Sequence, residues 1–179
     1  MILRGEKVML RYPKLSDAKW VFENIKRPEV SKMMAYFVDD MTSIKDEVAW
    51  IKSQPAKRKK KISFNFIIID KKTKALIGTC GIGDIDAREK RVTVGWWVAK
   101  KYWGKGNASD AVKLLIKFGF EKLKLNRLEA EVFTYNKRSF NFAKRLGFKL
   151  EGIARQKSFK RGKLIDDYEF SLLRKEWKG

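Results

Sequence analysis

The sequence contains no histidine and a single cysteine. Without histidine, a general base in this protein must be a carboxylate, a neutral amine, a tyrosine or a chain of water molecules. A histidine-based catalytic triad and a histidine-rich metal site are therefore excluded, and we expect no metal centre. The single cysteine also excludes an internal disulfide bond.

Long apolar runs are absent as well. No segment reaches the roughly 20 consecutive apolar residues that a membrane-spanning helix requires. The N-terminal sequence MILRGEKVML lacks the apolar core of a secretory signal peptide. These absences predict a cytoplasmic protein without a membrane partner.

Acidic residues are scarce relative to basic ones, with 21 Asp and Glu against 42 Lys and Arg and a formal net charge of +21. The electrostatic field of a protein with this net charge attracts polyanions, namely nucleic acid, ribosomes or the phosphates of a nucleotide cofactor, and it repels polyamines. The alternative is that the lysines are solvated surface residues without a partner. The run KRKKK at residues 57–61 has the same two interpretations, a site for RNA phosphates or a solvated loop.

With 179 residues and 44% hydrophobic content, the chain suits a single domain, 1–179, with a sizeable core. Apolar residues recur with the period of strands in some segments and of helices in others, so the predicted fold class is α/β (α+β). The predicted strands cover residues 6–12, 62–70, 76–85, 91–96, 127–134, 148–159 and 163–173. The predicted helices cover residues 17–26, a segment from Thr42 or Ser43 to about Pro55, a segment through 111–123, and 139–146.

The stretch 91–125 organises the rest of the chain. Val92 and Val94 alternate with residues that are not apolar, which predicts a strand with one buried face. Gly104 and Gly106 follow in a polar turn, and a helix is predicted after them. A strand, a glycine turn and a helix together present free backbone N–H groups and the positive end of a helix dipole to an anion. The glycine pair alone also fits a turn that binds nothing.

A second motif, YNKRSFNFAKRLGF at residues 135–148, follows one further strand. Together with YWGKG at 102–106, it resembles the Gcn5-related N-acetyltransferase (GNAT) superfamily, and most closely the branch that acetylates the N-termini of ribosomal proteins. The resemblance covers nearly the whole chain in order and spacing. It implies a single GNAT-like domain with a mixed central sheet of about six to seven strands, splayed at the cofactor site and flanked by about four helices. It also implies acetyl-CoA as the cofactor.

The resemblance assigns the cofactor to the end of the central strand, the glycine turn and the second motif. In the family the strand opens at a bulge, here residues 96–98, and its free backbone groups bind the pantetheine arm and polarise the thioester carbonyl. The pyrophosphate then lies on the backbone N–H groups of the turn, where two lysines add positive charge. The cofactor-binding residues implied in this way are Trp97, Val98, Lys101, Trp103, Gly104, Lys105, Gly106, Asn107, Ala108, Asn136 and Ser139.

The resemblance implies a residue for the general acid of the reaction but none for the general base. Ser139 matches a serine that, in the ribosomal branch, protonates the leaving thiolate, and it fits a helix-capping role equally well. The tyrosine donor of other members has no counterpart, because its position is Ala143. The two usual carboxylate positions of the family are Thr93 and Ser158, neither of which takes up a proton at neutral pH.

Two routes for the proton of the acceptor amine remain open. In the first, Thr93 and Ser158 order a water molecule that relays the proton to a nearby carboxylate, for which the candidates are Asp84, Asp86 and Glu131. In the second, no base is needed, because an α-amine with a pKa of about 7.7–8.0 is already partly neutral, whereas a lysine has a pKa of about 10.4. The second route favours a protein N-terminus as the acceptor.

Three further features have structural and functional interpretations. The cluster of methionines and aromatic residues at 33–37, which includes Tyr36, fits core packing or the lining of the acceptor pocket. Cys80 is predicted to be a small buried residue, because family members transfer acetyl directly and need no nucleophile. The three glycines of the 76–85 strand are expected where a side chain would obstruct close packing.

The sequence therefore predicts an acetyl-CoA-dependent N-acetyltransferase that acts on a primary amine, most specifically the N-terminus of a ribosomal protein, by direct transfer in a ternary complex. One alternative acceptor is a small amine or an aminoglycoside-like molecule, which requires an acidic pocket. An alternative of another class is a basic RNA-binding protein that keeps the fold and has lost catalysis. Family members are often dimers, so a homodimer is one expected assembly, and the charge of +21 is consistent with ribosome or RNA association.

Overall fold

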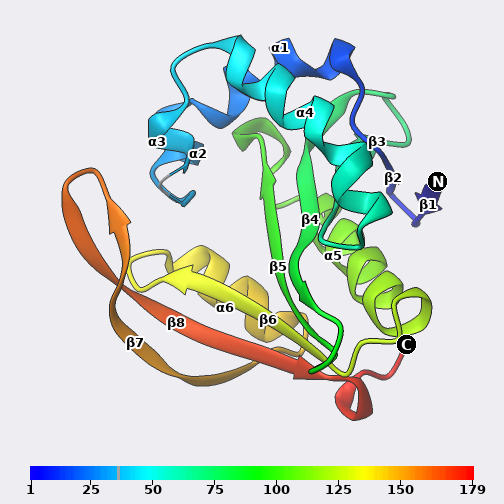
Figure 1. Cartoon of the computed structure of the whole chain (residues 1–179), viewed down its shortest axis with the longest axis vertical. Helices are drawn as coiled ribbons and strands as arrows, with labels where there is room; N and C mark the ends of the chain where they lie inside the picture. The colour runs from blue at the N-terminus through cyan, green and yellow to red at the C-terminus, as the bar shows by residue number, and fades with distance from the viewer. Residues whose placement is uncertain (36) are drawn as a thin grey trace.

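The computed structural model describes residues 1–35 and 37–179, and Figure 1 shows its arrangement. The strands are β1 (Ile2–Arg4), β2 (Val8–Arg11), β3 (Phe64–Asp70), β4 (Leu76–Asp86), β5 (Arg91–Val98), β6 (Arg127–Phe133), β7 (Lys149–Lys160) and β8 (Lys163–Leu173). The α-helices are α1 (Ala18–Ile25), α2 (Pro28–Ser31), α3 (Phe37–Asp40), α4 (Ile44–Lys59), α5 (Asn107–Lys117) and α6 (Lys137–Arg145). A turn of π-helix, Phe118–Lys122, extends α5.

Within the described residues the strands form one mixed eight-stranded sheet in the order β1-β2-β3-β4-β5-β6-β8-β7. All neighbours are antiparallel except β5 and β6, which are parallel. The α/β class is confirmed, and the described chain has one strand more than the upper prediction because the short β1 carries too few residues for a periodic signal. It also has six α-helices where about four were predicted, because α2 and α3 are single turns of four residues.

The sheet has a core on each face, which explains the continuous apolar run of β3. Phe66 and Ile68 point to one face, where they join the core beneath α5 and α6. Ile67 and Ile69 point to the other face, where Val21 of α1 and neighbouring residues of α2 and α3 cover them. Because successive side chains of a strand alternate between faces, both registers must be apolar when both faces are buried.

The sheet is split between its two central strands. β5 and β6 pair only through residues 91–93 of β5, and the following residues of β5 pair with β4 alone. The predicted bulge at residues 96–98 is wrong, because β4 and β5 stay in register from Thr93 to Val98 and shift only between Gly83 and Asp86. The split therefore arises because β5 and β6 diverge, as Figure 1 shows.

Helix α4 is longer than the sequence predicted. Ser43 caps its start as expected, since its side chain accepts a hydrogen bond from the backbone N–H of Lys45 at 3.2 Å. The helix then continues through Pro55 and ends at Lys59, so most of the KRKKK run is helical and the predicted loop is wrong there. Positive side chains in the last turn, Lys57, Arg58 and Lys59, interact favourably with the negative end of the helix dipole.

Gly78 of β4 allows the closest approach of two strands beside the split. A Cβ atom at Gly78 would lie 2.1 Å from the backbone oxygen of Trp97, whereas a Cβ atom at Gly83 would have no neighbour within 4 Å. A Cβ atom at Gly81 would lie 2.0 Å from the side-chain oxygen of Asn65, so the predicted need for glycine is confirmed at Gly78 and Gly81 and wrong at Gly83.

We expect Gly78→Ala to lower the free energy of unfolding by about 1–3 kcal/mol, because β5 must shift to relieve the overlap. Gly83→Ala is the matched control and should stay within about 0.5 kcal/mol of the wild type. Urea unfolding of the three proteins measures the difference. Equal stabilities for the two variants would contradict the strand spacing described above.

Candidate active site

The turn after β5 is shaped to receive an anion. Gly104 and Gly106 have φ angles of 74° and 81°, a region in which glycine is strongly preferred. The first hydrogen bond within α5 is donated by the backbone N–H of Asp110 to the carbonyl of Gly106, at 3.0 Å. The backbone N–H groups that precede Asp110 in α5 therefore have no acceptor within the helix. These groups and the helix dipole favour a phosphate at this position.

The Asp110 side chain fixes the start of α5, and the sequence interpretation missed it. Its carboxylate accepts hydrogen bonds from the backbone N–H groups of Glu6, Lys7 and Val8 at 3.2, 2.8 and 2.9 Å. The Lys7 ammonium also donates to the carbonyl of Lys105 at 3.0 Å. The segment between β1 and β2 therefore anchors the glycine turn.

A cavity of about 400 Å³, which we call the glycine-loop cavity, lies between this turn and α6. Its lining includes Gly104, Gly106 and Ala108 on one side and Arg138 and Arg145 on the other. The guanidinium of Arg138 also stacks on the ring of Trp103. Backbone N–H groups and two arginines give the cavity the donors and the charge that a pyrophosphate needs.

The open edge of β5 supplies main-chain groups to the same cavity. The N–H of Ala99 donates to the carbonyl of Ile77 at 2.8 Å, so Ala99 and Trp97 direct their main-chain groups toward β4. The main-chain groups of Trp96 and Val98 consequently point away from β4, into the split. The carbonyl of Val98 accepts a hydrogen bond from the indole of Trp103 at 2.6 Å. Among the described residues, β6 does not pair with Trp96, so the main-chain donor and acceptor of Trp96 are left open on this edge.

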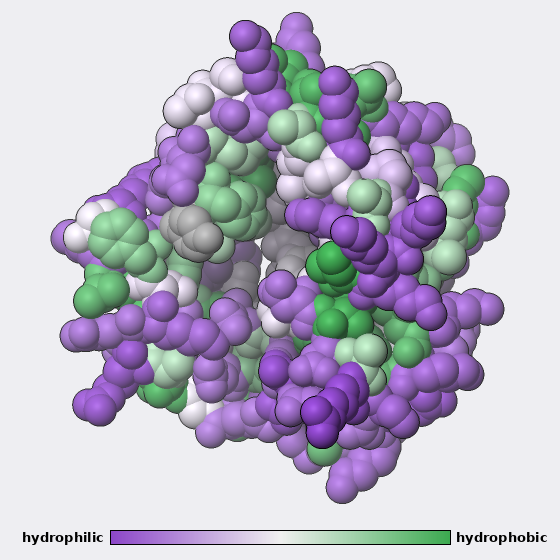
Figure 2. Space-filling model, viewed as in Figure 1, coloured by the Kyte–Doolittle hydropathy of each residue, from purple (hydrophilic) through white to green (hydrophobic). Residues whose placement is uncertain are grey.

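A second cavity, of about 720 Å³, lies on the other side of the split and is hollowed from the face shown in Figure 2. We call it the carboxylate cavity, because the described residues that line it include five carboxylates and a single lysine, Lys57. The carboxylates are Asp46 and Glu47 of α4, Asp84 of β4, Glu131 of β6 and Asp167 of β8. In a chain with a net charge of +21, this lining reverses the local charge.

The two cavities share part of their lining. Trp96, Trp97, Asn136 and Ser139 border both of them, together with Met33 and Met34. The Asn136 side chain caps α6 by accepting the backbone N–H of Ser139 at 3.1 Å. Because Asn136 performs the capping, the Ser139 hydroxyl is not needed for it, and no other described residue forms a hydrogen bond with that hydroxyl. Ser139 therefore stands where the cavities meet.

Asp167 is a buried carboxylate that the sequence interpretation missed. It is 1% exposed, its Oδ2 accepts a hydrogen bond from the Ser158 hydroxyl, and its Oδ1 has no partner among the described residues. Burial raises the pKa of Asp167, although the Ser158 hydrogen bond opposes this effect. An irregularity of β7 between Ala154 and Ser158 brings the hydroxyl opposite β8. No local signal in the sequence marks Asp167, because it alternates with the apolar Tyr168 and Phe170 and shares its strand face with the polar Glu169 and Ser171.

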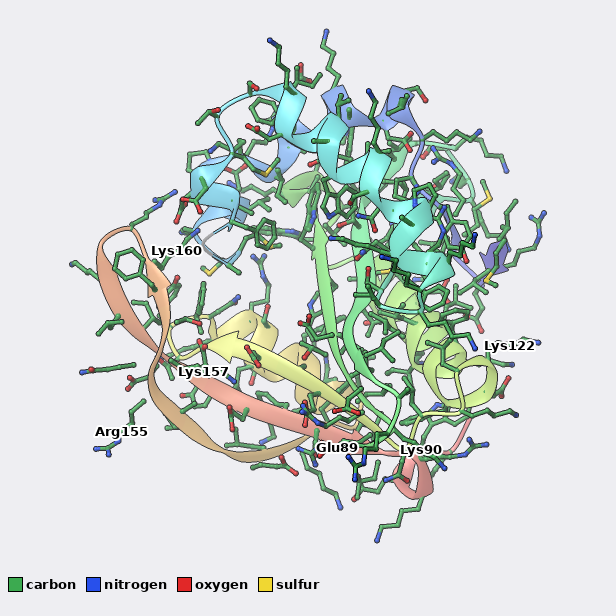
Figure 3. The ribbon with its side chains drawn as sticks, viewed as in Figure 1. Glu89, Lys90, Lys122, Arg155, Lys157 and Lys160 are labelled. Carbon is green, nitrogen blue, oxygen red and sulfur yellow. The ribbon has the colours of Figure 1, made fainter. Side chains whose placement is uncertain are left out.

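Glu131 is held in an ion pair, whereas Asp167 forms none with a described residue. The Lys157 ammonium donates to Glu131 and to Glu169, at 2.8 Å in each case. Figure 3 shows Lys157 on the β7–β8 hairpin and Arg155 pointing outward from the same strand. The hairpin is also tied to the α2–α3 segment, since the buried Lys160 pairs with Asp39 at 2.9 Å. These ion pairs hold the β7–β8 hairpin in place along one side of the carboxylate cavity.

Glu47 is the second carboxylate that the sequence interpretation missed. It is 4% exposed, and its Oε1 has no hydrogen-bond partner among the described residues. Burial raises the pKa of Glu47 to about 7. A carboxyl group whose pKa is higher in the folded than in the unfolded chain stabilises the fold fully at low pH, and that stability is lost as the pH rises through the folded value.

Wild-type protein should therefore lose about 1–3 kcal/mol of stability between pH 4.5 and 8 relative to Glu47→Gln, whose amide does not ionise. Urea unfolding of both proteins at several pH values within this window measures the difference. Glu23→Gln, at an exposed position of α1, is the matched control and should follow the wild type. Parallel pH profiles for wild type and Glu47→Gln would contradict the burial of this carboxylate.

Comparison with known proteins identifies the family. Residues 7–149 match the family model of the acetyltransferase (GNAT) domain. The chain belongs to the GNAT acetyltransferase family. Over 178 residues it is 37% identical to the uncharacterized N-acetyltransferase p20 of Bacillus licheniformis, which covers 99% of this chain and 98% of p20. The chain is an N-acetyltransferase, as the sequence predicted.

Two further relatives lie in the predicted branch. The putative ribosomal N-acetyltransferase YdaF of Bacillus subtilis (strain 168) is 34% identical over 105 residues, which cover 59% of this chain and 57% of YdaF. The solved structure of RimL, a ribosomal L7/L12 α-N-protein acetyltransferase in complex with coenzyme A, superposes with a TM-score of 0.89 at 16% identity and covers 97% of this chain and 98% of RimL. At this identity, the RimL match shows a shared fold.

Acetyl-CoA is the cofactor of this GNAT acetyltransferase, and the glycine-loop cavity fits it. Positive φ angles at two glycines leave the backbone bare, and the start of α5 offers unpaired N–H groups. A β-carbon at Gly104 would meet nothing within 4 Å, so space for a ligand lies against this residue. The same turn, the open edge of β5 and the start of α6 would hold the pyrophosphate and the pantetheine arm.

Most of the cofactor-binding residues predicted for this GNAT acetyltransferase lie together. Trp97, Val98, Trp103, Gly104, Gly106, Ala108, Asn136 and Ser139 line the glycine-loop cavity. Lys101 and Lys105 do not line it, although their ammonium groups lie by the ring of Tyr102, which does. Asn107 does not line it either, since its buried amide donates to Asp70 at 3.3 Å.

The residues predicted to relay a proton lie in the other cavity. Thr93, Asp84 and Glu131 line the carboxylate cavity together with Ser158. Asp86 instead caps the turn after β4 by accepting the N–H groups of Arg88 and Glu89.

The remaining interpretations concern the methionines and the cysteine. Met33 and Met34 are half-buried and line both cavities, so the pocket interpretation of the 33–37 cluster applies to them, and Tyr36 lies outside the described residues. Cys80 is 2% exposed, as predicted, and burial raises the pKa of its thiol above the usual range. A buried thiol with a raised pKa is a poor nucleophile. No helix among the described residues has the length and apolar character needed to cross a bilayer.

Proposed function

We propose that this enzyme transfers an acetyl group from acetyl-CoA directly to the free α-amine of a protein N-terminus. The observation that carries this proposal is the shared border of the two cavities at Trp96, Trp97, Asn136 and Ser139. A donor in one cavity and an acceptor in the other meet there without an intermediate carrier. Proximity of two bound reactants accounts for a large part of the rate of such reactions.

Bound acetyl-CoA supplies an activated thioester, and residues of the chain bind it, polarise its carbonyl and transfer the protons. The N–H of Trp96 on the open edge of β5 would polarise the thioester carbonyl of a bound acetyl-CoA. The Ser139 hydroxyl, at the junction of the cavities, would donate a proton to the leaving thiolate. Cys80 is buried and forms no covalent intermediate, which agrees with direct transfer.

Asp167 is the proposed acceptor of the amine proton. Its Oδ1 has no partner in the described part of the chain, while the Ser158 hydroxyl holds Oδ2 and orients the carboxylate. Burial raises the pKa of Asp167 and thereby makes its carboxylate a stronger base. Ser158, which stands at a usual carboxylate position of the family, acts here through its neighbour on β8.

The identity of the amine follows from its acidity and from the relatives. An α-amine has a reference pKa of about 7.7–8.0, so a carboxylate base removes its proton far more readily than that of lysine at about 10.4. The relatives YdaF and RimL, named for ribosomal acetyl transfer, support a ribosomal protein as the acceptor. The net charge of +21 supports work beside ribosomal RNA in the cytoplasm.

Release of free thiol from acetyl-CoA tests this proposal with a panel of peptides, lysine side chains, small amines and aminoglycosides. Peptides with a free N-terminus should be turned over, and the same peptides blocked at the N-terminus should not. Ser139→Ala should lower kcat on every acceptor by about 10²-fold or more. Turnover of lysine side chains alone would overturn the proposed acceptor.

The five carboxylates favour one second candidate, a small cationic amine or an aminoglycoside-like molecule. The sequence alone showed no such cluster, because its members come from four separate elements. In the same panel, turnover confined to these small amines would establish this candidate in place of the protein N-terminus.

A further inference from the structure

The carboxylate cavity carries more negative charge than one reacting amine requires. Its carboxylates reach it from both sides of β5, with Glu47 on α4 and Asp167 on β8 (Figure 1). Asp167 lies with Ser158 at the proposed place of proton transfer. Glu47 has no role in that transfer, because it belongs to the opposite wall.

The burial of the Glu47 carboxylate in the wall of this cavity is nevertheless unusual. It is 4% exposed, and no described residue forms a hydrogen bond or an ion pair with its Oε1. A buried carboxylate without a partner costs folding free energy, which a bound cation would offset. Burial raises the pKa of Glu47 to about 7 because it disfavours the charged form, and a bound cation beside the carboxylate would favour that charged form.

The surroundings of Glu47 suit a long cationic side chain. Trp50, one helical turn along α4, and Ile62 provide apolar and aromatic surface in the same cavity. Such surface packs against the methylene groups of a long side chain and against the face of a guanidinium. The single lysine of the lining leaves the acidic groups in excess among the described residues.

We propose that Glu47 binds a second positive charge of the acceptor, a lysine or arginine side chain within its first three residues after the reacting α-amine. This inference rests on the proposed function and names the class of N-terminus that the enzyme prefers. The reacting amine lies at the junction with the glycine-loop cavity, and the basic side chain extends toward α4. Glu47 is a specificity-determining residue in this arrangement and takes no part in the chemistry.

Peptides that differ only in charge at one position test this inference. Arginine at position 2 or 3 is compared with citrulline, which has nearly the same shape but no charge, and neither side chain is itself an acetyl acceptor. Wild-type kcat/KM should be about 10- to 100-fold higher for at least one arginine peptide than for its citrulline partner. Glu47→Gln should reduce this ratio to below about threefold and leave the citrulline rate close to wild type.

A binding measurement separates specificity from catalysis. Calorimetry without acetyl-CoA, using the same peptides, should give the same ratio of dissociation constants and the same loss in Glu47→Gln. Glu23→Gln is the control and should keep the preference of the wild type. Equal rates and equal binding for arginine and citrulline peptides would overturn the inference and leave the proposed function intact. Absence of turnover on every peptide, with acetyl-CoA still bound, would overturn the proposed function and this inference with it.

Discussion

Valine at both Gly104 and Gly106 is expected to weaken acetyl-CoA binding by at least about 100-fold. Both positions have positive φ angles, which β-branched residues strongly disfavour. The turn must therefore change conformation, and the N–H groups at the start of α5 lose their alignment toward the pyrophosphate. Hydrogen bonds to a charged group contribute about 1.5–3 kcal/mol each, so the loss of two accounts for this effect.

Titration calorimetry with acetyl-CoA measures the loss, and circular dichroism shows whether the variant is folded. Gly152→Val is the matched control, because a side chain there would meet nothing within 4 Å and its φ angle is not positive. The control should bind acetyl-CoA like the wild type. Unaltered binding by a folded Gly104→Val, Gly106→Val double variant would place the cofactor elsewhere.

Asp167→Asn is expected to lower kcat by about 10²-fold or more while the dissociation constant of acetyl-CoA stays unchanged. The amide keeps the shape of the carboxylate and a partner for Ser158, but it does not accept a proton. Because burial raises the pKa of Asp167, the wild-type rate should fall at acidic pH as this carboxylate becomes protonated. The variant should lose that acidic limb of the pH–rate profile.

Asp166→Asn is the matched control for this prediction. Asp166 precedes Asp167 on β8, points to the other side of the strand, and accepts the N–H of Gln156 at 2.7 Å, a bond that asparagine also forms. Its kcat should remain within about threefold of the wild type. A kcat for Asp167→Asn that is equally close to the wild type would show that another group, or water alone, removes the proton.

The cofactor side of the site was predictable because its signals are local. Gly104, Gly106 and the start of α5 follow one another in the chain. The two glycines indicate positions where the backbone adopts a positive φ angle. Asn136 likewise lies three residues before the N–H that it caps. Such local contacts can be predicted from neighbouring residues in the sequence, without knowing the fold. The mixed sheet and its splaying at the cofactor site came instead from the resemblance to the GNAT superfamily, and the strand order was not predicted.

The carboxylate cavity was predictable only in part, because its residues meet only in the folded chain. The resemblance led to Asp84, Thr93 and Glu131, whereas Glu47 and Asp167 come from a helix and a strand that are distant in sequence and that no spacing links. Asp167 was missed for the further reason that its partner is a serine rather than a charged residue. The helical course of α4 through Pro55 was missed because tertiary packing outweighs the local preference of proline to end a helix.

The site of acetylation in a single peptide tests the central claim most directly. The peptide carries a free α-amine and an internal lysine, and after incubation with enzyme and acetyl-CoA both peptide and enzyme are fragmented and mapped by tandem mass spectrometry. Direct transfer at the junction of the two cavities predicts one acetyl group, on the α-amine, and none on Cys80. Acetylation of the lysine, or an acetyl group retained on the enzyme, would contradict it.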